Sequence, residues 1–416
     1  MKIILKSFTP EPIEISAKSS YISHSSDKVT KIFEKNFSDP LGYIKKIITM
    51  GHLSVLEHIY FNFLIEDAPL INEIFLIRFR LASFTVKSRR YTNVIEDGFY
   101  EDEYYKIDNN FKKKIINFYE KAIINNINLE DARFVLPLSS KTNMVFSVNA
   151  RELGYILYSG LYEENHSTIK KMAEMLREEA NKVFPIYYDL DYFAVKKMNI
   201  FNVKSSLLRI TDSVEILNKD EIKIKEYENA IGFTTNNNLY SENQFDLKKS
   251  LLLPHNRALE FINIIVFIKN ISIPALTHLL RHRIQSIIVP YFEKINSNYL
   301  IPESFEIKGL TNEFLDIIIE SKKLEKSNIL NRLVSSTYPV LTNINAREML
   351  HIMRLRLCNR AQWEIRNIFT DILFKLRKIN QLFNYIGPSC FIFGLCPEGN
   401  KTCKKIKEVI NFFEPN

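Results

Sequence analysis

Apolar and polar residues follow a strand-like pattern in two segments that lie far apart in the chain. One reads YFNFLIEDA at residues 60–68, and the other reads NIIVFIKNIS at residues 263–272. In both, β-forming residues alternate with polar ones or cluster, which is typical of a strand with one buried face. Each segment therefore predicts a β-strand.

Helical spacing of apolar residues follows each predicted strand. The segments PLINEIFLIRFRLASF (69–84) and SIPALTHLLRHRIQSI (272–287) are helix-like. Two longer stretches with a 3.6-residue period cover residues 149–184 and 345–379. Each begins with an Asn in N-cap position and has a Glu three residues later, so we expect a long helix in each.

These elements form two tandem repeats. The arginine-bearing helices are offset by 281 − 78 = 203 residues, and the Asn-Ala-Arg segments by 345 − 149 = 196 residues. Because order and spacing agree, the chain is predicted to contain one repeat at 1–200 and a second at 201–416, with a boundary near 195–205. The predicted fold class is α+β, with a mixed sheet and long helices in each repeat.

Composition is that of a folded protein with two domains. The chain has 416 residues, of which 46% are hydrophobic and 25% are charged. The formal net charge of +8 favours anionic partners, but basic residues are scattered among acidic ones, which argues against a nucleic-acid-binding surface. No apolar run is long enough for a membrane span, and charge interrupts the N-terminal segment, so we expect a cytoplasmic protein without a membrane partner.

The cysteines do not predict a metal site. Three of the four lie in the segment GPSCFIFGLCPEGNKTC, residues 387–403. A zinc site needs a fourth ligand and closer spacing, and four cysteines are too few for a disulfide scaffold in a chain of this length. We interpret them as thiols of a structured tail and expect no metal.

Several segments together resemble the flavin-dependent thymidylate synthases. The signature of that family is Arg-His-Arg, a short gap, and then Ser-x-Arg-Tyr. The resemblance touches both repeats and covers most of the chain. The segments that carry it are HLSVLEH (52–58), RFRLASFTVKSRRY (78–91), VLPLSSKTNMVFSVNAREL (135–153), ALTHLLRHR (275–283), NAREMLHIMRLRLCNRAQWEI (345–365) and GPSCFIFGLCPEG (387–399).

The first repeat keeps the second part of this signature and loses the first. Ser88, Arg90 and Tyr91 are present. The residues that depart from the family pattern are Phe75, Phe79, Thr85, Val86 and Gly160. Phe79 replaces the family's His, and Gly160 stands where the resemblance places a substrate-activating arginine, nine residues after Arg151.

The second repeat shows the opposite losses. It retains Arg281, His282, Arg283, Asn345, Arg347 and, nine residues after Arg347, Arg356. Its loop has Tyr291 and Glu293 where the family has Ser and Arg, and a glutamate there would repel a phosphate. The defects of the two repeats are complementary.

The resemblance implies a reaction and an assembly. In the reaction, reduced FAD, supplied by NADPH, transfers a one-carbon unit from methylenetetrahydrofolate to C5 of dUMP and gives dTMP. The family is a homotetramer with sites shared between subunits. A duplicated chain can build a pseudo-tetramer from two copies, so we expect a homodimer in which the first repeat supplies the nucleotide loop and the second supplies the flavin residues and Arg356.

The resemblance also implies roles for individual residues. Arginine forks suit a phosphate dianion, and a cation beside the uracil stabilises negative charge that develops on the ring. The residues expected to bind substrate are Ser88, Arg89, Arg90, Arg133, His278 and Arg356, with Ser88 and Arg356 also catalytic. The residues expected to bind the cofactor are Ser54, Asn149, Arg281, His282, Arg283, Asn345 and Arg347.

Other interpretations of the same residues stay open. The loop around Ser88 and Arg90 is also compatible with a solvated basic turn, and Arg133 with a surface position. Asn149 and Asn345 suit helix caps, and residues 281–283 suit a helix C-terminus, where cations oppose the macrodipole. For the whole chain, the alternatives are a flavoprotein that modifies another pyrimidine nucleotide, an inactive partner, or a basic nucleic-acid-binding protein.

Overall fold

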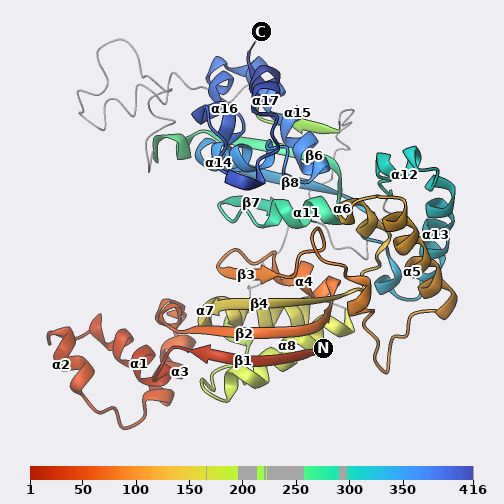
Figure 1. Cartoon of the computed structure of the whole chain (residues 1–416). Coiled ribbons are helices and arrows are strands. Elements are labelled where there is room, and N and C mark those ends of the chain that lie inside the picture. Colours follow the sequence, from red (N-terminus) through yellow and green to blue (C-terminus); the bar gives the residue numbers. More distant parts are fainter. Residues whose placement is uncertain (165, 195–212, 220–221, 223–256, 290–297, 416) are drawn as a thin grey trace, which may run out of the picture. The chain divides into compact units, whose positions relative to one another are not determined.

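The protein consists of two compact units, seen in a computed structural model of the chain (Figure 1). The structure describes residues 1–164, 166–194, 213–219, 222, 257–289 and 298–415. Unit 1 contains Met1–Ser206 and Ile301–Val334, and unit 2 contains Leu207–Leu300 and Ser335–Asn416. The predicted repeat boundary near 195–205 lies entirely outside the described residues.

Each unit has a four-stranded antiparallel sheet. In unit 1 the strand order is β1-β2-β4-β3, and in unit 2 it is β5-β6-β8-β7. The strands of unit 1 are β1 (Lys2–Phe8), β2 (Tyr60–Pro69), β3 (Ala82–Val86) and β4 (Lys141–Asn149). Those of unit 2 are β5 (Val214–Ile216), β6 (Asn263–Ser272), β7 (Gln285–Ile288) and β8 (Thr337–Asn345).

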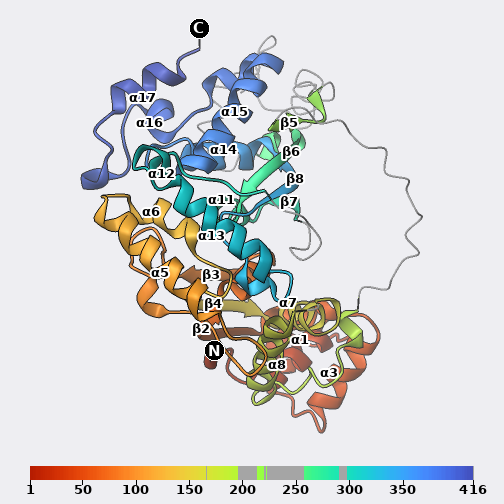
Figure 2. The same ribbon diagram turned by 90° about the vertical axis from the view of Figure 1, so that its right-hand side faces the viewer.

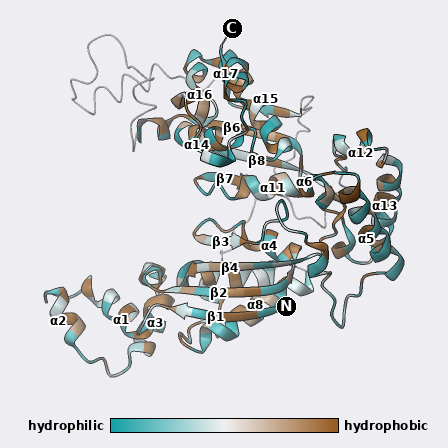
Figure 3. Ribbon diagram, viewed as in Figure 1, coloured by the Kyte–Doolittle hydropathy of each residue, from teal (hydrophilic) through white to brown (hydrophobic). Residues whose placement is uncertain are grey.

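The two sheets have the same register. Tyr60 pairs with Asn149 in unit 1, and Asn263 pairs with Asn345 in unit 2, which reproduces the sequence offsets of 203 and 196. Strands β2 and β6 share one alternation of buried and exposed positions and one irregularity in register, after Ile65 and after Ile268. Figure 3 shows hydrophobic and hydrophilic residues along β2 and β4. The predicted strands and the duplication are therefore confirmed.

Helices cover one face of each sheet. In unit 1, α8 packs against β1 and α4, and in unit 2, α15 packs against β5 and α11. The helices of unit 1 are α1 (Pro12–Ile22), α2 (Val29–Glu34), α3 (Pro40–Thr49), α4 (Leu70–Leu76), α5 (Asn109–Ile124), α6 (Leu129–Ala132), α7 (Ala150–Tyr158), α8 (Ser167–Asn181), α12 (Glu303–Ile307) and α13 (Thr311–Leu324). In the described part of unit 2 the helices are α11 (Ile273–Leu280), α14 (Ala346–Arg356), α15 (Trp363–Ile379), α16 (Ser389–Phe393) and α17 (Ile406–Phe413).

The predicted helices are shorter in the structure. The segment 69–84 forms α4 and then strand β3, and 272–287 forms α11 and then β7. The stretch 149–184 contains α7, a π-helical turn and α8, while 345–379 contains α14 and α15. The breaks occur where polar residues cap a new helix, since the side chains of His166 and Gln362 accept hydrogen bonds from the first turns of α8 and α15.

Within unit 1, a segment of the second repeat pairs with its counterpart in the first. Pro137 forms an antiparallel bridge with Leu333, and the two are equivalent because 333 − 137 = 196. Helices α5 and α13 lie side by side in both views (Figures 1 and 2), where equivalent rings of Phe118 and Phe314 have centroids 5.4 Å apart. The pairing of like with like indicates a local pseudo-two-fold axis.

The observed fold class is α+β, in two tandem copies, as predicted. We expected a mixed sheet in each repeat. Every strand pair named above is antiparallel, so that part of the prediction is wrong. Among the described helices, none is both long and apolar enough to cross a membrane.

Candidate active site

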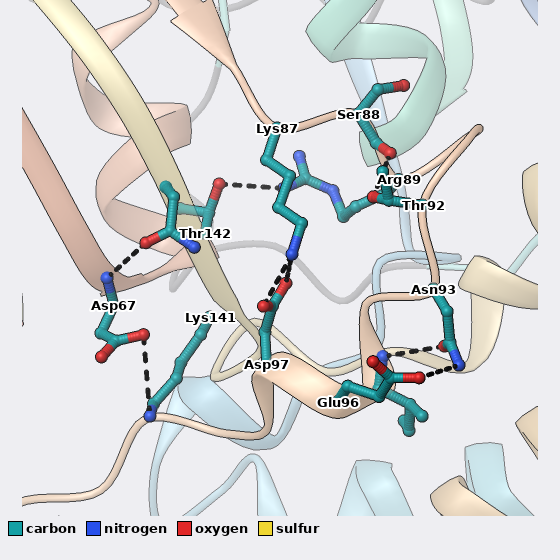
Figure 4. A network of polar contacts seen from close by, with 12 residues as sticks. Asp67, Lys87, Ser88, Arg89, Thr92, Asn93, Glu96, Asp97, Lys141 and Thr142 are labelled. Atoms are coloured by element: carbon teal, nitrogen blue, oxygen red, sulfur yellow. Dashed lines mark hydrogen bonds and ion pairs between the residues drawn. The ribbon is translucent and has the colours of Figure 1, made fainter.

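The predicted nucleotide loop follows strand β3 as a tight turn. The carbonyl oxygen of Ser88 accepts hydrogen bonds from the backbone N–H of Thr92 at 3.1 Å and from its hydroxyl at 2.7 Å. Lys87 fixes the start of the turn, because its ammonium donates to both carboxylate oxygens of Asp97 at 2.7 Å (Figure 4). The turn carries Ser88, Arg89 and Arg90 on consecutive positions.

Arg89 points into the protein. Its guanidinium donates two parallel hydrogen bonds of 2.8 Å to the carboxylate of Glu73 on α4, a side chain with no exposed surface. The hydroxyl of Thr142 on β4 donates to Glu73 at 2.7 Å and accepts from Arg89 at 3.2 Å. Figure 4 shows the Arg89 guanidinium directed at Thr142. The three side chains therefore form one buried polar network.

Arg90 and Arg133 meet at one residue, Glu130 on α6. The Arg90 guanidinium forms an ion pair with the Glu130 carboxylate, and the Arg133 Nε donates to the Glu130 carbonyl at 3.1 Å. The structure thus brings together Ser88, Arg90 and Arg133. It buries Arg133, which is 5% exposed, so the surface interpretation of that residue is wrong.

The first repeat has an apolar cluster where the second has charged and imidazole groups. The rings of Phe75 and Phe79 pack edge to face with centroids 5.3 Å apart. A Cβ at Gly160 would lie 2.9 Å from the Cβ of Ala173 and 3.4 Å from the ring of Phe75. An arginine cannot be accommodated at position 160 without displacing these neighbours.

The equivalent positions of unit 2 form a hydrogen-bonded chain around Arg356. Its Nε donates to His282 Nε2 at 2.9 Å, and its Nη2 donates to the carbonyl oxygen of His278 at 3.4 Å. Because a guanidinium can only donate, His282 Nε2 must be the acceptor and the proton lies on Nδ1, which faces Glu348 Oε1 at 3.4 Å. His282 is therefore held as one neutral tautomer.

Burial lowers the pKa of His282 below its ordinary value of 6.5, and Arg356 lowers it further, against an opposing hydrogen bond to Glu348. The folded state binds a proton less readily than the unfolded chain. The contribution of neutral His282 to stability is therefore fully present above pH 6.5 and is lost as the pH falls through the lowered pKa. Protonation would also turn Nε2 into a donor facing the Arg356 cation.

We therefore expect that the melting temperatures of the wild type and of His282→Gln converge in acid. Glutamine keeps an acceptor oxygen for Arg356 but does not titrate. Thermal unfolding of both proteins from about pH 7.5 to about pH 5 measures this. A difference in melting temperature that stays constant over the range would contradict a neutral His282 in the folded protein.

Three further predicted residues lie near the hydrogen bond between Arg356 and His282. His278 is buried in α11. Arg281 and Arg283 are exposed on either side of buried His282, and Arg281 is the C-terminal cap residue of α11. A cation at the C-terminal end of α11 can oppose the helix macrodipole and also attract an anion. The helix-end interpretation of the cluster and its predicted anion-binding role are therefore compatible.

The remaining predicted residues include helix caps and one member of an ion pair within the units. The side-chain oxygens of Asn149 and Asn345 accept hydrogen bonds from the backbone N–H groups of Glu152 at 2.8 Å and Glu348 at 2.9 Å, which confirms the helix caps. Arg347 forms an ion pair with Glu260 in unit 2, and the same pair joins Arg151 to Glu57 in unit 1. Ser54 is exposed in the 3-10 turn Leu53–His58, which packs against α7.

Two predictions fall outside the described residues, namely the substitutions Tyr291 and Glu293 in the second loop. Among the residues that the structure describes, no group of three or more His, Cys, Asp or Glu side chains could hold a metal ion.

The sequence interpretation missed the acidic partners of the arginines, which are Glu73, Glu130 and Glu348. A signal existed for Glu73, because it is the one carboxylate within the apolar helix PLINEIFLI. A buried carboxylate requires a partner, so its position predicts a cation nearby. No comparable signal distinguishes Glu130 from a surface residue.

The comparison with known families decides the relationship. A family model described as "Thymidylate synthase complementing protein" matches residues 5–186 and 215–380, one segment in each repeat. The chain belongs to this family. The two matched segments agree with the duplication seen in the sheets.

Curated relatives of this family are similar to about half of the chain. A flavin-dependent thymidylate synthase of Pyrococcus horikoshii is 34% identical over 194 residues, which are 44% of this chain and 80% of the relative. One of Geobacter sulfurreducens is 32% identical over 188 residues, 42% of this chain and 81% of the relative. Among solved structures, the flavin-dependent thymidylate synthase ThyX of Helicobacter pylori, complexed with FAD and dUMP, is 24% identical, covers 44% of this chain and 98% of its own, and has a TM-score of 0.37.

Proposed function

We propose that the protein is an FAD-dependent thymidylate synthase that forms dTMP from dUMP, with methylenetetrahydrofolate and NADPH as co-substrates. It would act as a homodimer in which two duplicated chains replace four single ones. Family membership supports the reaction class. The observation that carries the proposal is the separation of functions: the loop with Ser88 and Arg90 survives in the repeat that has Gly160, and Arg356 survives in the repeat whose loop has Glu293.

The loop residues would bind the nucleotide. Arg90 and Arg133 approach each other at Glu130, and a phosphate dianion would compete with that carboxylate for the Arg90 guanidinium. Ser88 would add a hydroxyl next to them. Arg356, held in place by His282 and the His278 carbonyl, would stabilise negative charge that develops on the uracil when C5 acts as a nucleophile.

The residues of the second repeat fit a flavin dinucleotide. Exposed arginines at 281 and 283 provide cations for a diphosphate, and buried His282 between them fixes the direction of the segment. FAD, when bound, would supply the reducing equivalents of the reaction. Arg347 is less suited to contact it directly, because its guanidinium is paired with Glu260 as in the other repeat.

The proposal is tested by incubating the purified protein with FAD, dUMP, methylenetetrahydrofolate and NADPH. We expect dTMP, and we expect FAD titration to saturate at one equivalent per chain, because only the second repeat keeps the complete Arg-His-Arg segment at 281–283. Saturation at two equivalents per chain would contradict the division between repeats. Product from another pyrimidine nucleotide but not from dUMP would favour the related flavoprotein instead, and absence of any product would point to an inactive partner.

A further inference from the structure

Arg89 is placed differently from the other residues of its loop. Ser88 and Arg90 stand on either side of it, and its own guanidinium donates three hydrogen bonds to Glu73 and Thr142 inside unit 1. The carboxylate of Glu73 receives two donors from Arg89 and a third from the Thr142 hydroxyl. We call Glu73, Arg89 and Thr142 the loop anchor.

The loop anchor joins three separate elements. Glu73 lies on α4, Thr142 lies near the start of β4, and Arg89 lies in the turn that follows β3. A bidentate arginine–carboxylate contact fixes direction as well as distance, because two parallel hydrogen bonds must be satisfied at once. The backbone of residue 89 is thereby tied to the helix and to the central strand, and its neighbours Ser88 and Arg90 are fixed with it.

The second repeat lacks all three residues of the anchor. At the equivalent positions it has Leu276 for Glu73, Phe292 for Arg89 and Tyr338 for Thr142, from the offsets of 203 and 196. Leu276 and Tyr338 are fully buried in unit 2, while Phe292 lies outside the described residues. Leu276 and Tyr338 therefore fill two of these positions in the same fold, so the polar residues Glu73 and Thr142 are not needed to form the helix or the sheet.

The anchor is present in the repeat that keeps Ser88 and Arg90, and it is absent in the repeat that has Tyr291 and Glu293 instead. Burying an ion pair is costly, and replacing one by well-packed apolar residues is often neutral or stabilising. Stability alone therefore does not explain why the first repeat retains this pair. We infer that the loop anchor positions Ser88 and Arg90 for the nucleotide phosphate, and that Arg89 is a positioning residue rather than a phosphate ligand.

This inference rests on the proposed function, and a transplant between repeats tests it. The triple variant Glu73→Leu, Arg89→Phe, Thr142→Tyr carries the residues of the second repeat. We expect it to fold with a melting temperature close to that of the wild type and to bind FAD unchanged. We expect the KM for dUMP to rise about tenfold or more, because a loop displaced by about 1 Å no longer meets the phosphate.

Two further variants complete the test. Arg89→Lys keeps the charge but cannot form the two parallel bonds, so it should raise the KM for dUMP in the same direction even if the triple variant does not fold. The matched control is Glu325→Leu with Arg332→Met, which removes another buried arginine–glutamate pair of unit 1 and should leave the KM unchanged.

The outcomes separate the anchor from the proposed function. If the wild type forms dTMP and the folded triple variant or Arg89→Lys has a wild-type KM for dUMP, the positioning role is wrong while the proposed function stands. If the wild type neither binds dUMP nor forms dTMP, the proposed function fails, and the anchor has no substrate loop to position. A KM that rises equally in the control pair would also overturn the inference, since the effect would then be one of general stability.

Discussion

Replacing Arg356 by alanine is expected to lower kcat for dTMP formation by about a hundredfold or more, with a smaller change in the KM for dUMP. A cation that acts on charge developing in the transition state affects kcat more than ground-state binding. In the structure the guanidinium is held by His282 Nε2 at 2.9 Å and by the His278 carbonyl at 3.4 Å, so it is positioned before any substrate binds. Steady-state kinetics with dUMP as the varied substrate measures the separation.

The control for this variant is Arg366→Ala, which removes an arginine of α15 that donates to the Asn359 backbone carbonyl at 3.4 Å. It should retain wild-type kcat. The kcat of Arg356→Lys should lie between those of Arg356→Ala and the wild type, because an ammonium retains the charge but not the forked geometry. Equal kcat in Arg356→Ala and the wild type would remove Arg356 from the catalytic residues.

The duplication and the strands could be predicted from the sequence because each produces a pattern within a short segment. An Asn-Ala-Arg start and an alternating strand recur at nearly fixed offsets, and both Asn residues cap helices as predicted. The length of the helices was wrong for a local reason as well. The helical periodicity of the sequence continues across each break. The N-caps that begin the next helix, His166 and Gln362, are single residues in a polar stretch.

The partners of the site residues could not be predicted in the same way. Arg89 and Glu73 are 16 residues apart in sequence, and only the folding of β3 back beside α4 and β4 brings them into contact. The Arg356–His282 contact spans 74 residues and likewise depends on the sheet. Sequence indicates which residue types are present, whereas the fold decides whether an arginine faces a carboxylate or remains available to an anion.

One segment of the second repeat packs in unit 1, and no local sequence pattern predicts this placement. Residues 301–334 belong to the second repeat in sequence, yet they pack within unit 1 against their equivalents of the first repeat. Lys121 on α5 pairs with Glu313 on α13, but the equivalent residues are Ile317 and Asn117, so this ion pair has no symmetry-related counterpart. Duplication has therefore allowed a symmetric contact to become asymmetric.

The division of the proposed site residues between the two repeats makes a test of the shared site possible, because each repeat can be inactivated alone. Arg90→Ala removes the proposed phosphate ligand from the first repeat, and Arg356→Ala removes the proposed activating cation from the second. If each site takes its nucleotide loop from one chain and Arg356 from the other, a mixed dimer of the two variants contains one site with both defects and one intact site.

We therefore expect that mixed dimers of Arg90→Ala and Arg356→Ala, purified through two different tags, recover about half of the wild-type turnover per dimer, while each parent variant is inactive. The recovery follows from counting intact sites and needs no change in affinity. Dimers that carry both substitutions in the same chain, paired with a wild-type chain, are the matched control. They place one defect in each site and should be inactive. Inactive mixed dimers together with half-active controls would show that each chain builds its site alone, and would overturn the shared site.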